Sequence, residues 1–167
     1  MIILGDKIKS AAQIQSIIKR IAYQIYENNI EEKELVIVGI TPKGSELASQ
    51  LIKAIERFSN LKINYGELTI NKNNPRDTVE FNISKSHLEN KSIVIVDDVL
   101  NTGSTLIYAV KYFLTIPIKQ IKTAVMVNRN HKNFPIKADF KGISLSTSTN
   151  EHVSVILDTE KGGIFLR

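Results

Sequence analysis

The chain has 167 residues, of which 43% are hydrophobic and 23% charged, as is typical of a globular protein in which residues 1–167 form one domain. Its net charge of +5 favours anionic partners, such as phosphorylated metabolites or RNA. The absence of cysteine excludes disulfides, thiolate metal sites and thiol catalysis, and the scattered histidines show no metal-ligand spacing. Because no apolar run suits a secretory signal or a membrane span, we expect a cytoplasmic protein without a membrane partner.

The first half of the chain predicts helices and strands in alternation. Isoleucines recur at helical spacing between residues 10 and 28, and Ser10 with Gln13 forms a capping-box pattern at the start. The continuous apolar run at 35–40 predicts a strand covered on both faces, and a second helical stripe spans 47–58. A strand at 61–70 precedes the polar segment NKNNPRD, in which proline and adjacent asparagines predict a mobile loop.

The second half continues this alternation. It predicts a buried strand at 92–98, a turn at 101–105, a helix at 106–114 and a strand at 121–128. Further strands are expected within 137–146 and 152–158. Strands and helices that alternate through short turns predict an α/β fold, in which right-handed crossovers link a parallel sheet.

The segment IVIVDDVLNTGSTL, residues 93–106, carries the strongest functional signal. It joins a buried strand to two carboxylates and then to a glycine- and hydroxyl-rich turn that opens a helix, where an anion is favoured. Asp97 and Asp98 can accept hydrogen bonds from sugar hydroxyls. The groups that could donate to a phosphate belong to Thr102, Gly103, Ser104 and Thr105. Either half alone could be structural, a strand end or a helix cap, but the combination predicts a ribose 5-phosphate site.

A second turn, GITPKGSELA at 39–48, also has residues suited to bind phosphate. Its glycines have the spacing of a Walker A loop, but Lys43 precedes Gly44 instead of following it, so a nucleoside triphosphatase is not expected. A structural alternative stays open, in which Thr41 caps a helix, Pro42 occupies its first position and Lys43 is merely exposed.

The segment 93–106 resembles the motif with which type I phosphoribosyltransferases bind 5-phosphoribosyl-1-pyrophosphate (PRPP). The resemblance implies catalytic roles for Asp97 and Asp98, and Mg²⁺ that is bound mainly through PRPP and not by protein side chains. It also implies that the turn at 39–48 is the pyrophosphate loop. The residues of this loop would be Thr41, Lys43 and Gly44.

Over nearly its full length the chain is similar to the bifunctional pyrimidine-operon regulator and uracil phosphoribosyltransferase family. The similarity includes residues 3–25, 38–48 and 96–105, and especially the stretch VNRNHKNFPIKADFKGISLSTS at 127–148. It implies a five-stranded parallel core sheet flanked by helices, a small hood over the base, a mobile lid loop at 71–81 and a homo-oligomer of two or more chains. The lid would carry Arg76 and Asp77, and the base hood would include Arg129, Ser146 and Thr147.

Departures from the family pattern leave three functions open. Pro42-Lys43 stands where Thr-Arg is usual, which keeps the charge but loses the bidentate guanidinium contact. Ser104 stands where many relatives have arginine, which removes one cation near the phosphate. The chain is expected to transfer the phosphoribosyl group to a base, uracil above all, giving UMP and pyrophosphate. It could instead be an RNA-binding regulator that senses nucleotides, or a PRPP-binding module without catalysis. The RNA contacts implied by the resemblance are Lys19, Arg20, Lys132 and Lys137.

Overall fold

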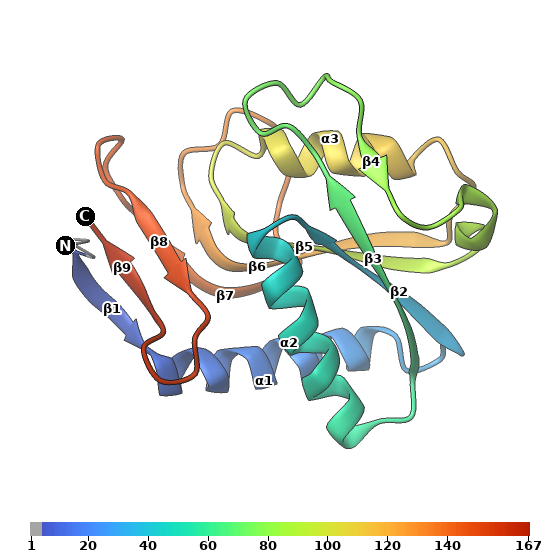
Figure 1. The fold of residues 1–167 in the computed structure, drawn as a ribbon, viewed down its shortest axis with the longest axis horizontal. Coiled ribbons are helices and arrows are strands. Elements are labelled where there is room, and N and C mark those ends of the chain that lie inside the picture. Colours follow the sequence, from blue (N-terminus) through green and yellow to red (C-terminus); the bar gives the residue numbers. More distant parts are fainter. Residues whose placement is uncertain (1–4) are drawn as a thin grey trace.

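In the computed structural model, which describes residues 5–167, the central sheet contains six strands (Figure 1). They are β2 (Glu34–Ile40), β3 (Lys62–Thr69), β4 (Glu80–Phe81), β5 (Ser92–Leu100), β6 (Gln120–Arg129) and β7 (Phe140–Leu145). Their order is β4-β3-β2-β5-β6-β7, and all neighbours pair in parallel except β4, which is an antiparallel edge strand. The predicted five-stranded parallel sheet is therefore confirmed.

Helices cover both faces of this sheet. α1 (Ala11–Asn28) and α2 (Lys43–Phe58) pack on one face, and α3 (Ser104–Phe113) packs on the other (Figure 1). Side chains of β2 and β5 enter the two hydrophobic cores alternately, which explains why these strands are continuously apolar. The capping box of Ser10 and Gln13 is present at the start of α1.

The start of α2 differs from the structural alternative that the sequence left open. Thr41 does not cap the helix, because Pro42 is the residue that precedes its first turn and no side chain caps it. The Thr41 hydroxyl lies 3.3 Å from the Thr69 hydroxyl, at the end of β3. The turn at 41–44 is thus joined to the neighbouring strand.

A second sheet joins the two ends of the chain. β1 (Asp6–Ser10) pairs with β9 (Gly163–Leu166), which pairs with β8 (Val153–Ile156), all antiparallel (Figure 1). Only β8 was predicted from the sequence. Residues 1–4, with the short N-terminal apolar run, lie outside the described part of the chain. Within residues 5–167, no helix is long and apolar enough to cross a membrane.

Candidate active site

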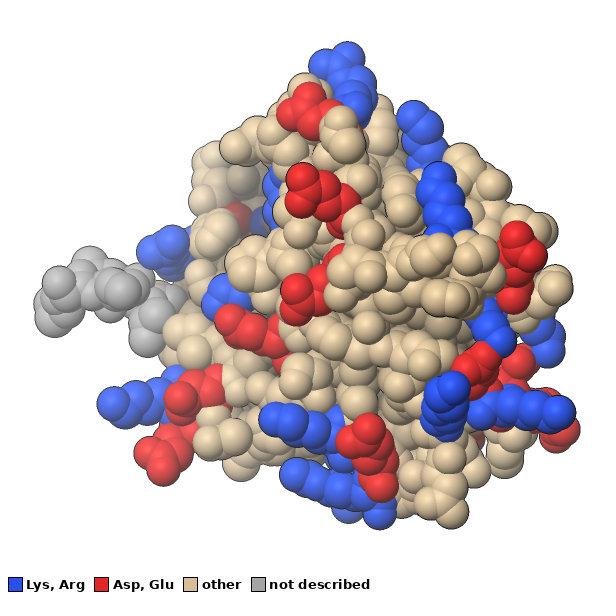
Figure 2. All heavy atoms as spheres, turned by 45° about the vertical axis from the view of Figure 1, so that its right-hand side comes forward, with Lys and Arg blue, Asp and Glu red and all other residues tan. Residues whose placement is uncertain are grey.

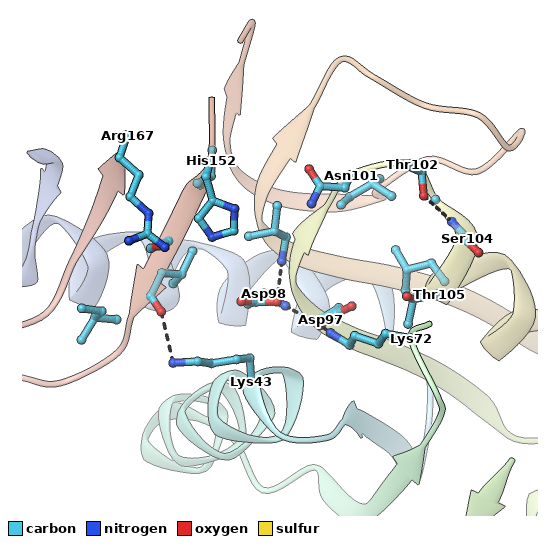
Figure 3. A pocket seen from close by; sticks show the side chains of 18 residues that line it. Lys43, Lys72, Asp97, Asp98, Asn101, Thr102, Ser104, Thr105, His152 and Arg167 are labelled. Carbon is cyan, nitrogen blue, oxygen red and sulfur yellow. Dashed lines mark hydrogen bonds and ion pairs between the residues drawn. The ribbon is translucent and has the colours of Figure 1, made fainter. Parts of the chain in front are cut away.

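A cavity of about 590 Å³ lies between the central sheet and the small sheet. Its wall consists of the end of β5 with the following turn, the first residue of α2, the loop after β3, and the strand β8. Parallel sheets place ligand sites at such carboxyl ends of strands. The charged or titratable side chains that line the cavity are Lys43, Lys72, Asp97, Asp98, His152 and Arg167 (Figure 3).

The two carboxylates at the end of β5 have different environments. Asp97 is only 2% exposed, whereas Asp98 is partly exposed to the cavity. The Asp98 amide donates to Asp97 Oδ1 at 2.9 Å, and the Val99 amide donates to Asp98 Oδ1 at 2.9 Å. The pKa of Asp97 is raised to about 7, mainly by burial. The nearby Lys72 ammonium opposes this rise, and the Asp98 carboxylate adds to it. The site therefore holds a buried carboxyl that can change protonation near neutral pH.

The turn at 101–105 is held in place from outside by the segment that follows β6. The Thr102 carbonyl accepts hydrogen bonds from the amides of Asn133 at 2.8 Å and Phe134 at 3.1 Å. Gly103 has φ +86°, and a Cβ there would lie 2.3 Å from a methyl group of Ile136. Glycine is therefore required both by the backbone conformation and by packing. The first turn of α3 begins here and contains no acidic residue.

The turn at 41–44 faces the carboxylates from the other side. Lys43 lines the cavity, and its Nζ lies 3.5 Å from the carbonyl of Val155 in β8. A Cβ on Gly44 would lie 2.3 Å from the Val96 carbonyl, so glycine allows α2 to start directly against β5. Thr41 and Gly44 do not line the cavity themselves, but they fix the backbone on either side of Lys43.

The predicted lid residues lie apart from this cavity. Arg76 and Asp77 line a separate hollow beside the end of β3. The Asp77 carboxylate accepts hydrogen bonds from the side-chain Nδ2 groups of Asn71 and Asn74, and Arg76 Nε donates to Asn74 Oδ1 at 3.3 Å. The residue of this loop that does reach the cavity is Lys72, which the sequence reasoning missed.

Arg129 and Thr147 lie near the cavity but do not line it. The guanidinium of Arg129 is buried and donates to Asn101 Oδ1, to the Thr147 hydroxyl, and to the carbonyls of Ser148 and Glu151. Ser146 is exposed. The side of the cavity opposite the carboxylates consists instead of β8 and His152, with Arg167 next to it (Figure 3). The one sequence signal for this wall is the alternating pattern of residues 152–158, which predicts the strand β8 but not its position beside the cavity.

The four residues expected to contact RNA are not equivalent. Lys19, Lys132 and Lys137 are exposed, and Lys137 lies 3.5 Å from the Asp139 carboxylate. Arg20 is exposed as well, but its guanidinium donates to the β7 carbonyls of Lys141 at 3.1 Å and Gly142 at 2.6 Å. On the face seen in Figure 2, acidic and basic side chains are interspersed, so that face has no single-signed patch.

Nothing among residues 5–167 forms a protein metal site of three or more acidic, histidine or cysteine side chains. The cavity offers two carboxylates as oxygen donors, fewer than a protein-held divalent cation requires. The described residues therefore fit Mg²⁺ whose ligands are the phosphate oxygens of a bound substrate and water, and not protein side chains.

Comparisons with known proteins agree with this geometry. A family model described as the phosphoribosyl transferase domain matches residues 5–159. The chain is 32% identical over 164 residues to a "Bifunctional protein PyrR" of Pediococcus pentosaceus, covering 92% of this chain and 93% of that one. It is 33% identical over 152 residues to a "Pyrimidine operon regulatory protein" of Lactococcus lactis subsp. lactis, covering 87% of this chain and 86% of that one. The hypoxanthine phosphoribosyltransferase of Trypanosoma cruzi has a similar fold, with a TM-score of 0.78 at 20% identity and coverage of 90% and 86% of the two chains.

Proposed function

Because the chain belongs to the phosphoribosyltransferase family, we propose that its cavity binds PRPP with Mg²⁺ and transfers the 5-phosphoribosyl group to uracil. The observation that carries this proposal is that one cavity brings together a carboxylate pair, an acid-free helix start and a lysine on the opposite wall. The carboxylates suit the sugar hydroxyls, the helix start suits the 5-phosphate, and the lysine suits the pyrophosphate of PRPP.

The distribution of charge in the cavity gives PRPP one orientation. The 5-phosphate binds at the turn 102–105, where first-turn amides of α3 and hydroxyls can donate. The ribose hydroxyls then lie against Asp97 and Asp98, and the pyrophosphate extends toward Lys43. The base is left on the side of the cavity formed by β8 and His152.

The reaction breaks the bond between ribose C1′ and pyrophosphate and forms a bond from C1′ to a base nitrogen, which loses its proton. Positive charge develops on the ribose ring, where Asp97 and Asp98 stabilise it, and Lys43 stabilises the departing pyrophosphate. Bound Mg²⁺ would be held by PRPP oxygens and water and would offset charge on the leaving group. Residues 71–81 are proposed to act as a lid that excludes water.

The support for a pyrimidine base comes from the relatives and not from the cavity wall. Among the described residues that line the cavity there is no Phe, Tyr or Trp, and the imidazole of His152 could stack on either kind of base. The relatives named above include one called a pyrimidine operon regulatory protein. Uracil would be recognised by backbone groups of residues 153–156 and by His152.

A panel of labelled bases, each supplied with PRPP and Mg²⁺, tests the proposal. Uracil is expected to give UMP, and guanine, hypoxanthine, xanthine, adenine and orotate are expected to react much more slowly. Preferred reaction of a purine would contradict the assignment to uracil but leave the transferase intact. The absence of any nucleotide, with PRPP binding measured by calorimetry, would leave a PRPP-binding module.

A second function, that of an RNA-binding regulator that senses nucleotides, is favoured by the surface between α1 and α2. Lys19, Lys53 and Arg57 line a groove there beside Tyr23 and Phe58. The two aromatic rings stack at 4.1 Å between centroids, and Tyr23 is 41% exposed. Basic side chains next to an exposed ring suit a single-stranded nucleic acid, since phosphates and bases both find partners.

Fluorescence anisotropy with pyrimidine-operon leader RNA, at two salt concentrations and with or without UMP, tests this second function. Binding that weakens with salt and with the double substitution Lys19→Gln and Tyr23→Ala is expected. Lys33→Gln, an exposed lysine outside the groove, is the matched control. Equal RNA binding by all three proteins would rule out this surface.

A further inference from the structure

Lys72 links the loop after β3 to the buried carboxylate of the active site. Its Nζ lies 3.4 Å from Asp97 Oδ1 (Figure 3). The Asp97 side chain is 3% exposed and the Lys72 side chain is 42% exposed, so the lysine reaches inward from solvent to a group that solvent scarcely reaches. A buried carboxylate next to a second carboxylate is costly to ionise unless a cation accompanies it.

The other basic side chains around the cavity point elsewhere or lie on other walls. Lys43 Nζ is at the Val155 carbonyl. His152 and Arg167 line the cavity from the side of the small sheet (Figure 3). Position 104, next to the expected phosphate, is a serine and contributes no charge. Lys72 is thus the cation that the structure pairs with Asp97.

We propose that Lys72 is a positioning residue of the transferase reaction, which stabilises the ionised form of Asp97 and orients it toward the ribose of PRPP. This inference rests on the proposed function and adds to it a residue from the loop at 71–81. Lys72 acts through Asp97 and need not contact the substrate. The ion pair also holds the start of this loop at the cavity, so the same contact organises the carboxylate and the edge of the site.

The direction of the pH effect follows from the charges that face Asp97. Burial and Asp98 raise the pKa of Asp97, and Lys72 opposes both. Without Lys72, the pKa of Asp97 rises further, so less of the enzyme has an ionised carboxylate at neutral pH. Lys43, His152 and Arg167 remain in the cavity in both proteins and do not account for a difference between them.

Steady-state kinetics of Lys72→Met against pH test the proposal. At pH 7 we expect kcat/KM for PRPP to fall by about fivefold, because a rise of about one unit from a pKa of about 7 lowers the ionised fraction of Asp97 from about a half to about a tenth. The loss should shrink as pH rises, because Asp97 ionises again. Lys72→Arg should restore most of the activity, and Lys33→Met, an exposed lysine far from the cavity, should behave as the unchanged protein.

A purely structural role for Lys72 would lower stability without moving the pH profile, and an unchanged profile in Lys72→Met would overturn the proposal. Carbon-13 NMR titration of the Asp97 carboxyl in the substrate-free protein provides a second readout. We expect its midpoint to lie higher in Lys72→Met than in the unchanged protein. Equal midpoints would also overturn the proposal. If no base reacts at all, the proposed function fails, but this titration still decides whether Lys72 holds Asp97 ionised.

Discussion

Arg129 donates a hydrogen bond from Nη1 to Oδ1 of Asn101 at 2.7 Å, which ties the end of β6 to the turn after β5. The same guanidinium donates to the Thr147 hydroxyl at 2.7 Å and to the Glu151 carbonyl at 2.8 Å. One buried side chain therefore holds the loop that leads to β8 against the turn that would bind the 5-phosphate. Arg129 is better understood as a support for the cavity than as a group that contacts the base.

Arg129→Met should destabilise the protein by about 2–4 kcal/mol, since it leaves several buried oxygen atoms without a donor. PRPP affinity should fall as well, because Asn101 loses its partner next to the phosphate turn. Urea unfolding and calorimetry measure the two effects. Lys132→Met, which removes an exposed cation nearby, is the control and should change stability by less than about 0.5 kcal/mol.

Gly103→Ala should weaken PRPP binding strongly. The positive φ of +86° costs an L-residue about 1–2 kcal/mol, and the added methyl meets Ile136. The double substitution Gly103→Ala and Ile136→Ala separates the two causes, because it removes the clash and keeps the backbone strain. We expect it to recover part of the PRPP affinity measured by calorimetry; full recovery would show that the backbone conformation is not required.

Asp97→Asn should stabilise the fold at alkaline pH while it lowers activity. The folded-state pKa of Asp97, about 7, lies above its ordinary value, so its contribution to stability is greatest in acid and is lost as pH rises through 7. The asparagine carries no charge to bury. The free energy of unfolding of Asp97→Asn should therefore exceed that of the unchanged protein only slightly near pH 4, and by at most about 4 kcal/mol at pH 8. Urea unfolding at the two pH values measures this difference, and a variant that is less stable at both would contradict the assigned pKa.

Glu34 should show the opposite pH dependence at the far end of the sheet. Hydrogen bonds from Lys91 and Asn64 hold the pKa of Glu34 at about 2, below its ordinary value, and Lys62 contributes less. Its contribution is present above pH 5 and disappears as pH falls toward 2. Glu34→Gln should therefore cost about 1 kcal/mol at pH 7 and nearly nothing near pH 2, a modest value because Glu34 is itself 21% exposed and Lys62 is 71% exposed. Thermal unfolding of Glu34→Gln and of the unchanged protein between pH 2 and pH 7 measures this difference. The activity of the variant at pH 7 should be unchanged, because Glu34 lies far from the cavity.

The sequence predicts well those parts of the fold that depend on local patterns. The apolar runs of β2 and β5 and the capping box of Ser10 and Gln13 are confirmed because burial and capping follow directly from residue type. β1 and β9 were missed because they pair with each other from opposite ends of the chain. No local pattern reports such a pairing.

The same distinction applies to the site. The carboxylate pair and the glycine turn are adjacent in sequence, so residues 97–105 predict a common location, and the structure places them in one cavity. Lys72 could not be found in this way, because its approach to Asp97 depends on the path of the loop after β3. The family resemblance assigned Arg129 to the base hood, and the structure shows its guanidinium buried and bonded to Asn101. The direction of a side chain at the end of a strand depends on its burial and its partners, which a local sequence pattern does not report.

The central claim, that this cavity transfers a phosphoribosyl group, is tested most directly by UMP formation from uracil and PRPP in Asp98→Asn beside the unchanged protein. Asp98 is partly exposed at the cavity wall, so the substitution should leave folding intact, as circular dichroism can verify. We expect the unchanged protein to release UMP and pyrophosphate in equal amounts, and Asp98→Asn to do so at least about a hundredfold more slowly. Equal rates in the two proteins would contradict the assignment of this cavity as the active site.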